Sequence, residues 1–296
     1  MTADRKKTVT AGLSEAEEHR RRAGTVEAYY YRELAHAALA EVDDPTRVFM
    51  CSTARDEEAV SALLAPVSGL CRSGVSGAHF AKYCTVLCDS RGTSPTIADM
   101  FPRTSEDEPT TVAYVTGGFA DSAFAHFRDE FSHLCHIALR PHHAARVHNA
   151  CDCVLDGEAD FAIIPVRNGR DGHLRAFYRM ISDYDLKILS VAEVQTEDDK
   201  TCFALCGSDT SPLFPAPGYM EFSVTGGDGM ISVMTEAINA HGHTVSAINS
   251  SPAPSGKTLF HFVVRAGGDL RPTLLYLNLF HPAHTVLGIY GNINER

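Results

Sequence analysis

The stretch "DDKTCFALCGS", residues 198–208, decides how the middle of the chain folds. A charged turn leads into a threonine and then into apolar residues that end at Gly207, a pattern typical of a buried strand. Nearly the same phrase, "KYCTVLCDS", occupies residues 82–90, with Tyr83 in the position of Thr201. The repetition predicts a second strand and a duplicated α/β unit, with chance similarity between two buried strands as the alternative.

Two polar segments, residues 89–111 and 207–218, divide the chain, because both are too rich in Pro, Gly, Ser and Thr for continuous regular structure. The division predicts a solvated tail or frayed helix, an N-terminal α/β unit, a middle α/β unit and a C-terminal unit, over residues 1–24, 25–95, 112–206 and 219–291. Within the N-terminal unit we expect a strand over 46–53, a helix after it and a second strand over 82–90.

Composition narrows the class of protein. The chain has 296 residues, 44% of them apolar, and a formal net charge of −11, so it lacks the basic footprint that nucleic acid or an anionic membrane requires. Its nine scattered cysteines are typical of reduced thiols rather than a disulfide framework. No run reaches signal-peptide or membrane-span length. We expect a cytoplasmic protein without a metal or cofactor.

The C-terminal unit has the clearest pattern. Residues 219–226 alternate like a strand, residues 229–241 carry apolar side chains at helical spacing, and Gly242 ends that helix. Two more strands, a helix and a final strand follow, over residues 243–249, 258–265, 269–280 and 284–290. This β-α-β-β-α-β order predicts a ferredoxin-like unit with both helices on one face of an antiparallel sheet.

The same unit resembles an ACT regulatory domain. Gly229 and Met230 stand at the start of its first helix, "AINSSP" at 247–252 replaces the Glu-Ser-Arg-Pro turn of the aromatic-pathway members, and "VLGIYG" ends the unit. The resemblance implies an amino-acid effector bound by Gly229, Met230, Asn249 and Ser250. It also implies a homodimer or a higher homo-oligomer, because ACT domains commonly pair.

The middle unit begins with a strand, a glycine loop and a helix over residues 112–131. A second helix ends at Gly157, a buried strand runs from Asp160 to Val166, and a polar loop opens onto another helix. Loops at the carboxyl ends of strands collect the ligand-binding residues of α/β folds. We therefore expect the functional site of this unit in its glycine loop and in the polar loop after Val166.

These motifs resemble prephenate dehydratase. In that family a Gly-x-Ala-Asp strand leads to Pro-Ile-Glu-Asn-Ser, a glycine follows, and a later Thr-Arg-Phe strand supplies the catalytic threonine. The matching residues are Gly157, Ala159, Asp160, Pro165, Asn168, Gly172, Thr201 and Phe203, with Gly117 and Phe119 in the opening glycine loop. A dehydratase unit followed by an ACT domain is also the domain order of the family, so the resemblance covers residues 112–291.

The resemblance implies that Thr201 and Asn168 are catalytic and that Gly117, Phe119 and Phe203 bind the substrate. Prephenate loses CO2 and its ring hydroxyl and becomes aromatic, so a threonine hydroxyl that donates a hydrogen bond to the departing group assists the reaction.

The two carboxylates of prephenate require cationic partners. Cys202 stands where the family has an arginine, so Arg167 and Arg170 are the expected replacements. His173 is a further candidate, as an acid or base.

One feature of the family is missing. Dehydratases insert a second lobe between the asparagine loop and the threonine strand, whereas here only residues 183–200 separate the helix from Thr201. We expect the N-terminal unit or a second subunit to complete the cleft.

The leading functional hypothesis is a lyase that converts prephenate, a small anionic substrate, to phenylpyruvate. A prephenate decarboxylase that retains the ring hydroxyl is the first alternative. A non-catalytic protein that senses amino acids is the second.

Overall fold

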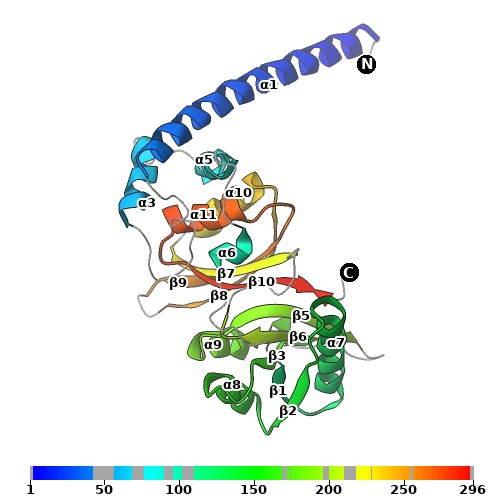
Figure 1. The fold of residues 1–296 in the computed structure, drawn as a ribbon. Helices are drawn as coiled ribbons and strands as arrows, with labels where there is room; N and C mark the ends of the chain where they lie inside the picture. The colour runs from blue at the N-terminus through cyan, green and yellow to red at the C-terminus, as the bar shows by residue number, and fades with distance from the viewer. Residues whose placement is uncertain are drawn as a thin grey trace.

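The computed structural model describes residues 3–42, 57–68, 77–89, 96–101, 110–168, 172–173, 175–195, 200–209, 218–227, 229–253 and 256–293. The fold is mixed α/β, as the sequence predicts, and all of its strands in these residues belong to one ten-stranded sheet. The sheet order is β2-β1-β3-β6-β5-β10-β7-β9-β8, and β4 pairs with β3 beside this path. Figure 1 shows two bodies joined through this sheet, with a long helix extending from the upper one.

The middle unit contributes strands β1 to β6. They are β1 (Thr111–Val115), β2 (Arg140–Ala144), β3 (Phe161–Asn168), β4 (Gly172–His173), β5 (Lys187–Gln195) and β6 (Lys200–Gly207). Its helices are α7 (Gly118–Cys135), α8 (Val147–Leu155) and α9 (Arg175–Asp183). Strands β1, β2 and β3 are parallel, whereas β6 is antiparallel to both β3 and β5.

Helices cover both faces of this part of the sheet. Phe127 and Phe131 of α7 pack on one face, against Phe203 and Leu205 of β6. On the other face α8 and α9 pack against Cys202, Ala204 and Cys206. Strand β6 lies between β3 and β5 and is buried from Thr201 onward, which confirms the strand predicted over residues 200–208.

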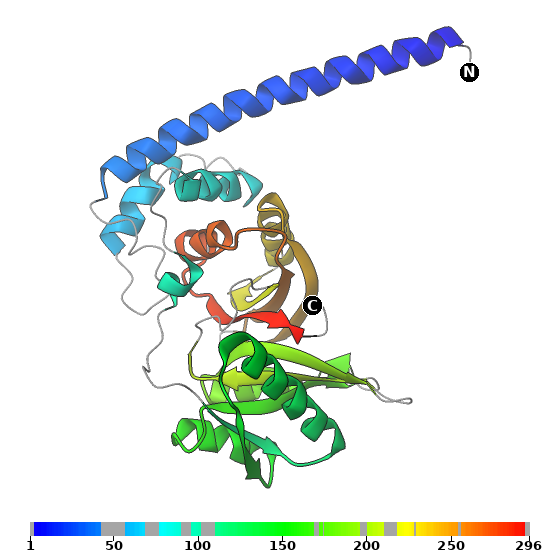
Figure 2. The same cartoon turned by 45° about the vertical axis from the view of Figure 1, so that its right-hand side comes forward.

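The C-terminal unit confirms the predicted β-α-β-β-α-β order. Its elements are β7 (Tyr219–Gly226), α10 (Met230–Ala240), β8 (Thr244–Pro252), β9 (Thr258–Arg265), α11 (Arg271–Phe280) and β10 (Thr285–Asn292). The strands pair antiparallel in the order β10-β7-β9-β8, which is the ferredoxin-like arrangement. Both helices lie on one face of these strands (Figures 1 and 2).

A parallel pairing between β5 and β10 joins the two units into one sheet. Gly288 of β10 lies so close to β5 that a Cβ atom there would be 2.3 Å from the carbonyl oxygen of Ile188. Ser190 adds a 3.4 Å hydrogen bond from its hydroxyl to the carbonyl oxygen of Gly291. Glycine at position 288 therefore permits the contact that fixes the two units side by side.

The predicted strand over residues 82–90 is wrong. Residues Gly77–Asp89 form helix α5, and its buried residues include Gly77, Ala81, Cys84 and Cys88, which are spaced three to four residues apart. Residues 82–90 and 200–208 are therefore similar in sequence but differ in secondary structure. Their similarity gives no support to a duplicated α/β unit. The strand expected over 46–53 lies outside the described residues.

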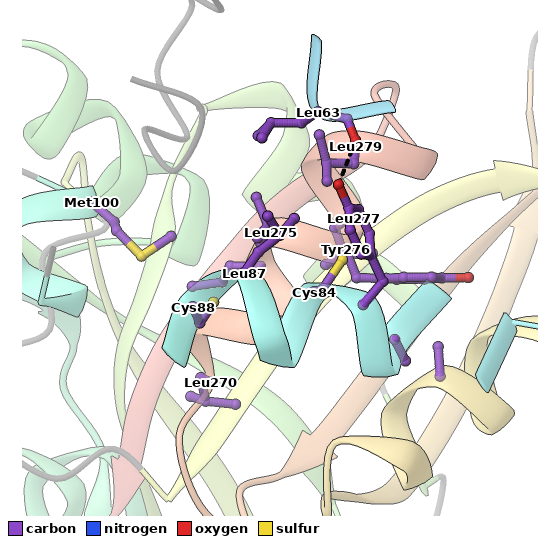
Figure 3. Close-up of a cluster of buried hydrophobic side chains, with 14 of the residues drawn as sticks. Leu63, Cys84, Leu87, Cys88, Met100, Leu270, Leu275, Tyr276, Leu277 and Leu279 are labelled. Carbon is purple, nitrogen blue, oxygen red and sulfur yellow. Dashed lines mark hydrogen bonds between the residues drawn. The ribbon is translucent and has the colours of Figure 1, made fainter. Parts of the chain in front are cut away.

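The N-terminal helices cover the C-terminal unit and not the middle one. Helix α3 (Glu57–Leu64), the short 3-10 helix η1 (Ala65–Val67), α5 and α6 (Ile97–Met100) share one apolar core with α10 and α11. Figure 3 shows Leu87 and Cys84 of α5 facing Leu275 and Tyr276 of α11, and the hydroxyl of Tyr83 donates a 2.7 Å hydrogen bond to the carbonyl oxygen of Leu63. The described part of this region therefore does not complete a cleft beside Thr201, as the sequence had led us to expect.

Of the tail and the helix expected over residues 1–24, the structure has the helix, because α1 runs without interruption from Ala3 to Ala40. Strong helix formers fill this segment, and an ion pair of 3.1 Å joins Arg22 to Glu18 one turn earlier. The C-terminal part of α1 packs on the body, through Tyr31, Ala35, Ala38 and other buried residues. The N-terminus lies far from the sheet (Figure 2).

Candidate functional site

A cavity of about 340 Å³ lies where β1 ends and α7 begins. It brings together three of the predicted substrate-binding residues, Gly117, Phe119 and Phe203, with Pro165 of β3. Its other lining residues are mainly apolar: Val115, Thr116, Gly118, Ala120, Val147 and Ile163. This is the carboxyl end of the parallel strands, where α/β folds bind ligands.

Thr201 is not among the residues that line this cavity, but it lies on the same side of the sheet. It pairs directly with Asn168 across the β3–β6 ladder, and its side chain lies on the same face of β6 as Phe203, two residues away. Thr201 is 9% exposed. The two residues predicted to be catalytic are thus neighbours on adjacent strands, on the face of the sheet that carries Phe203.

Arg167 lies on the opposite face of the sheet from Thr201. The β3–β6 register shifts between Pro165 and Arg167, so Val166 forms a bulge and Arg167 pairs with Cys202 instead of Thr201. The guanidinium of Arg167 forms an ion pair with Glu193, which lies opposite Cys202 on β5. The expectation that Arg167 and Thr201 contact the same substrate is therefore not met.

No lining side chain of the glycine-loop cavity within the described residues carries a charge. However, the first residues of two helices, Gly118 of α7 and Val147 of α8, line it. The first amide groups of a helix have no intrahelical acceptor and carry partial positive charge, so they attract anions. The cavity thus combines an apolar wall with two electropositive helix ends.

Of the other predicted site residues, Arg170 lies outside the described residues. His173 belongs to β4, where its backbone pairs with that of Arg167 at the end of β3.

A second cavity, of about 440 Å³, lies across the sheet between the two units. At its base Glu221 of β7 is 3% exposed and accepts hydrogen bonds from the hydroxyls of Tyr178 and, at 3.0 Å, Tyr290. Burial raises the pKa of Glu221 to about 7, although both hydrogen bonds act to lower it. At neutral pH this carboxyl can therefore both accept and donate a proton.

Two cations stand at the rim of the Glu221 cavity. Glu193 forms ion pairs with both Arg167 and Lys200, and Cys202 lies beside them. Burial raises the pKa of the Cys202 thiol to about 11, while Arg167 acts to lower it. Sequence reasoning missed Glu193, Lys200 and Glu221, because nothing local marks residues that meet only through the joining of two units.

The predicted effector residues separate into two places. Asn249 and Ser250 of β8 line a cavity of about 710 Å³ together with Tyr178 and Arg179 of α9. The side-chain amide of Asn249 donates a 3.2 Å hydrogen bond to the hydroxyl of Tyr178, whose ring stacks on His261 at 4.0 Å. Gly229 and Met230 are not among the residues of this cavity. They form the start of α10, where Gly229 has a φ of 91°.

Known proteins resemble this chain in structure and not in sequence. No protein-family model matches it, and no curated protein matches it significantly. A prephenate dehydratase from Streptococcus mutans matches with a TM-score of 0.50 and 16% identity, over 62% of this chain and 98% of its own. A prephenate dehydratase from Arthrobacter aurescens, solved in complex with L-Phe, matches with a TM-score of 0.50 and 14% identity, over 63% of this chain and 91% of its own.

The quorum-quenching acylase GqqA matches with a TM-score of 0.47 and 18% identity, over 61% of this chain and 94% of its own. The two dehydratase matches show a prephenate dehydratase-like fold over this part of the chain. Within the described residues, no helix is both long enough and apolar enough to cross a membrane.

Proposed function

We propose that the chain is a lyase that acts on prephenate or a close cyclohexadienyl acid, with its active site in the glycine-loop cavity. The observation that carries the proposal is the direct pairing of Thr201 with Asn168 on the sheet face of Phe203, which lines a cavity with Gly117 and Phe119. A dehydratase-like fold supports it. The proposed product, phenylpyruvate, rests on Thr201, which matches the catalytic threonine of the dehydratase motif.

The chemistry requires little beyond orientation and help for one leaving group. The ring carboxylate departs as CO2, its bonding electrons enter the ring, and the C4–O bond breaks so that the hydroxyl leaves as water after gaining a proton. The hydroxyl of Thr201 donates a hydrogen bond to that oxygen as negative charge develops on it. The apolar wall formed by Phe119, Pro165 and Phe203 holds the ring.

The helix ends supply the positive potential that the family's arginine would provide. Cys202 and Arg167 lie on the far face, so neither can contact a substrate held beside Thr201. In our proposal the substrate carboxylates bind the first amide groups of α7 and α8, at Gly118 and Val147. A second copy of the chain then closes the open side of the cavity, because the N-terminal helices pack elsewhere.

Incubation of the purified chain with prephenate tests the proposal through the spectrum of the product. Phenylpyruvate supports the dehydratase. A non-aromatic dihydro-hydroxyphenylpyruvate would assign a decarboxylase that retains the hydroxyl. Unchanged prephenate, with a folded protein and no binding by calorimetry, would contradict a lyase and favour a non-catalytic sensor.

We further propose that an amino acid regulates the protein from the cavity between α9 and β8. Arg179 and Asp183 of α9 form a 3.3 Å ion pair at this cavity, opposite Asn249 and Ser250. An amino acid carries both charges, so its carboxylate can bind Arg179 and its ammonium group Asp183. Binding there would change how α9 sits against the C-terminal unit.

Calorimetry with L-phenylalanine tests this regulatory site. Arg179→Gln is expected to weaken binding by about tenfold or more, the effect of losing one charged hydrogen bond. Arg128→Gln is the matched control, because Arg128 also forms an exposed ion pair with a nearby aspartate, on α7. Equal affinity in the two variants would place any amino-acid site elsewhere.

A further inference from the structure

Three side chains of the metal-ligating type meet at the edge of the middle unit. They are His142 of β2, Cys153 of α8 and Glu158 in the turn after α8, and one ligand atom from each lies within 4.8 Å of the other two. Their separations of 11 and 5 residues fit no common metal-binding motif. Only the packing of α8 against the sheet brings them together.

The turn after α8 holds Glu158 over Cys153. The amide of Glu158 donates a 2.8 Å hydrogen bond to the carbonyl oxygen of Cys153, and the amide of Gly157 donates one of 3.3 Å to Val154. Gly157 has a φ of 75°, so the turn is a Schellman motif with glycine in the left-handed position. This backbone geometry folds the chain back and presents the carboxylate to the thiol.

His142 approaches from a strand that is fixed independently. Strand β2 pairs with β1 along its whole length, with His142 opposite Ala113. Helix α8 packs on β1, β2 and β3, and its Ala150 and Cys151 are fully buried. The packed backbone thus fixes the positions of the three residues. Rotation of their side chains is enough to point all three ligand atoms at one ion.

We propose that His142, Cys153 and Glu158 bind a single Zn²⁺ ion. Tetrahedral zinc with ligands at about 2.0–2.3 Å requires ligand atoms roughly 3.3–3.8 Å apart. Side-chain rotations that move each ligand atom by about 1 Å bring the three atoms to this spacing. A water molecule takes the fourth position. A thiolate and an imidazole select zinc over Mg²⁺ and Ca²⁺, which prefer all-oxygen ligand sets.

The charges around the three residues favour a cation. The carboxylates of Asp152 and Asp156 lie close enough to Cys153 to act on it electrostatically. Asp152 is fixed by a 2.9 Å hydrogen bond from the hydroxyl of Tyr184. A dication bound between Cys153 and Glu158 therefore faces negative charge from the helix that carries the cysteine.

Titration of the full-length chain with Co²⁺, a spectroscopic substitute for Zn²⁺, tests the site. We expect one ion per chain and a near-ultraviolet band from thiolate-to-cobalt charge transfer, which Zn²⁺ abolishes on displacement. His142→Gln, Cys153→Ser and Glu158→Gln should each weaken binding by about tenfold or more. Cys153→Ser should also remove the charge-transfer band.

His143→Gln is the matched control, because His143 is the next residue of β2 and contacts Tyr114 on the other side. It should bind Co²⁺ like the unaltered chain. Circular dichroism checks that each variant is folded. If Cys153→Ser does not fold, the other two variants, His142→Gln and Glu158→Gln, still decide. Absence of stoichiometric binding, or equal affinity in those two variants and the control, would overturn the proposal.

Discussion

Thr201 lies directly opposite Asn168 in the antiparallel ladder between β3 and β6. The bulge at Val166 produces this pairing. In a regular ladder Arg167 would pair with Thr201, and Asn168 would pair with Lys200. One irregular residue thus decides which polar side chain shares a face with the threonine. It also directs Arg167 toward Glu193, away from the glycine-loop cavity.

Arg167→Gln should therefore leave prephenate affinity and turnover unchanged. Because the Arg167–Glu193 pair is half-exposed on the arginine side, its loss should cost no more than about 1 kcal/mol of unfolding free energy. Calorimetry and urea denaturation check the two statements. A loss of affinity of about tenfold or more would return Arg167 to the substrate site.

Glu221→Gln should change how stability depends on pH. The folded-state pKa of Glu221, about 7, lies above its ordinary value of 4.5, so the folded state binds the extra proton between these values. The contribution of Glu221 to the free energy of unfolding is fully present below pH 4.5. It is lost as the pH rises through 7, and the loss amounts to about 3 kcal/mol. Urea denaturation from pH 5 to 8 should show this loss in the unaltered chain, and Glu221→Gln should flatten it.

Glu236→Gln is the control for this measurement, because Glu236 is an exposed residue of α10. Its pH profile should follow that of the unaltered chain. A Glu221→Gln profile with the same slope would show that the buried carboxyl does not hold a proton near neutrality.

Gly288→Ala should weaken the contact between the two units and lower the free energy of unfolding. The added Cβ would lie 2.3 Å from a backbone oxygen of β5, and neither strand can move without breaking the shared sheet. We expect a loss of at least about 1–3 kcal/mol in urea denaturation. Gly268→Ala, where nothing lies within 4 Å of the new Cβ, should be close to neutral; equal costs at the two positions would contradict the tight β5–β10 contact.

Leu87→Ala should destabilise the protein by about 2–5 kcal/mol, because it leaves a cavity between α5 and α11. Leu155→Ala, at a position that is 67% exposed, should change stability by no more than about 0.5 kcal/mol. Thermal and urea unfolding measure both. A neutral Leu87→Ala would mean that the N-terminal helices do not share a core with the C-terminal unit.

The sequence predicts the C-terminal unit well because local pattern and tertiary environment agree there. Alternation over 219–226 predicts a strand and helical spacing over 229–241 predicts a helix, and the structure has β7 and α10 there. Residues 82–90 fail for the opposite reason. Their short apolar run fits a buried strand and a buried helix equally well, and only the partners of Cys84 and Cys88 decide for a helix.

The candidate site is predictable only as far as it is local. The motif resemblance finds Gly117, Asn168, Thr201 and Phe203, which the structure brings to one side of the sheet. Pro165 is compatible with a bulge, because proline lacks the amide hydrogen that a strand ladder requires, but it does not fix the direction of Arg167.

Other site residues depend on tertiary contacts that have no sequence pattern. The β5–β10 pairing brings Glu221 and Glu193 to one cavity. Packing of α8 on the sheet brings Cys153 and Glu158 to His142.

The rate of prephenate turnover by Thr201→Val tests the central claim most directly. Valine keeps the shape of threonine and removes only the hydroxyl, so turnover should fall by about 10²–10⁴-fold while substrate affinity and unfolding free energy change little. Thr244→Val, an exposed strand threonine of β8, should turn over prephenate at the unaltered rate. Equal turnover by Thr201→Val and Thr244→Val, both folded, would contradict a catalytic role for Thr201 and the active site assigned to its face of the sheet.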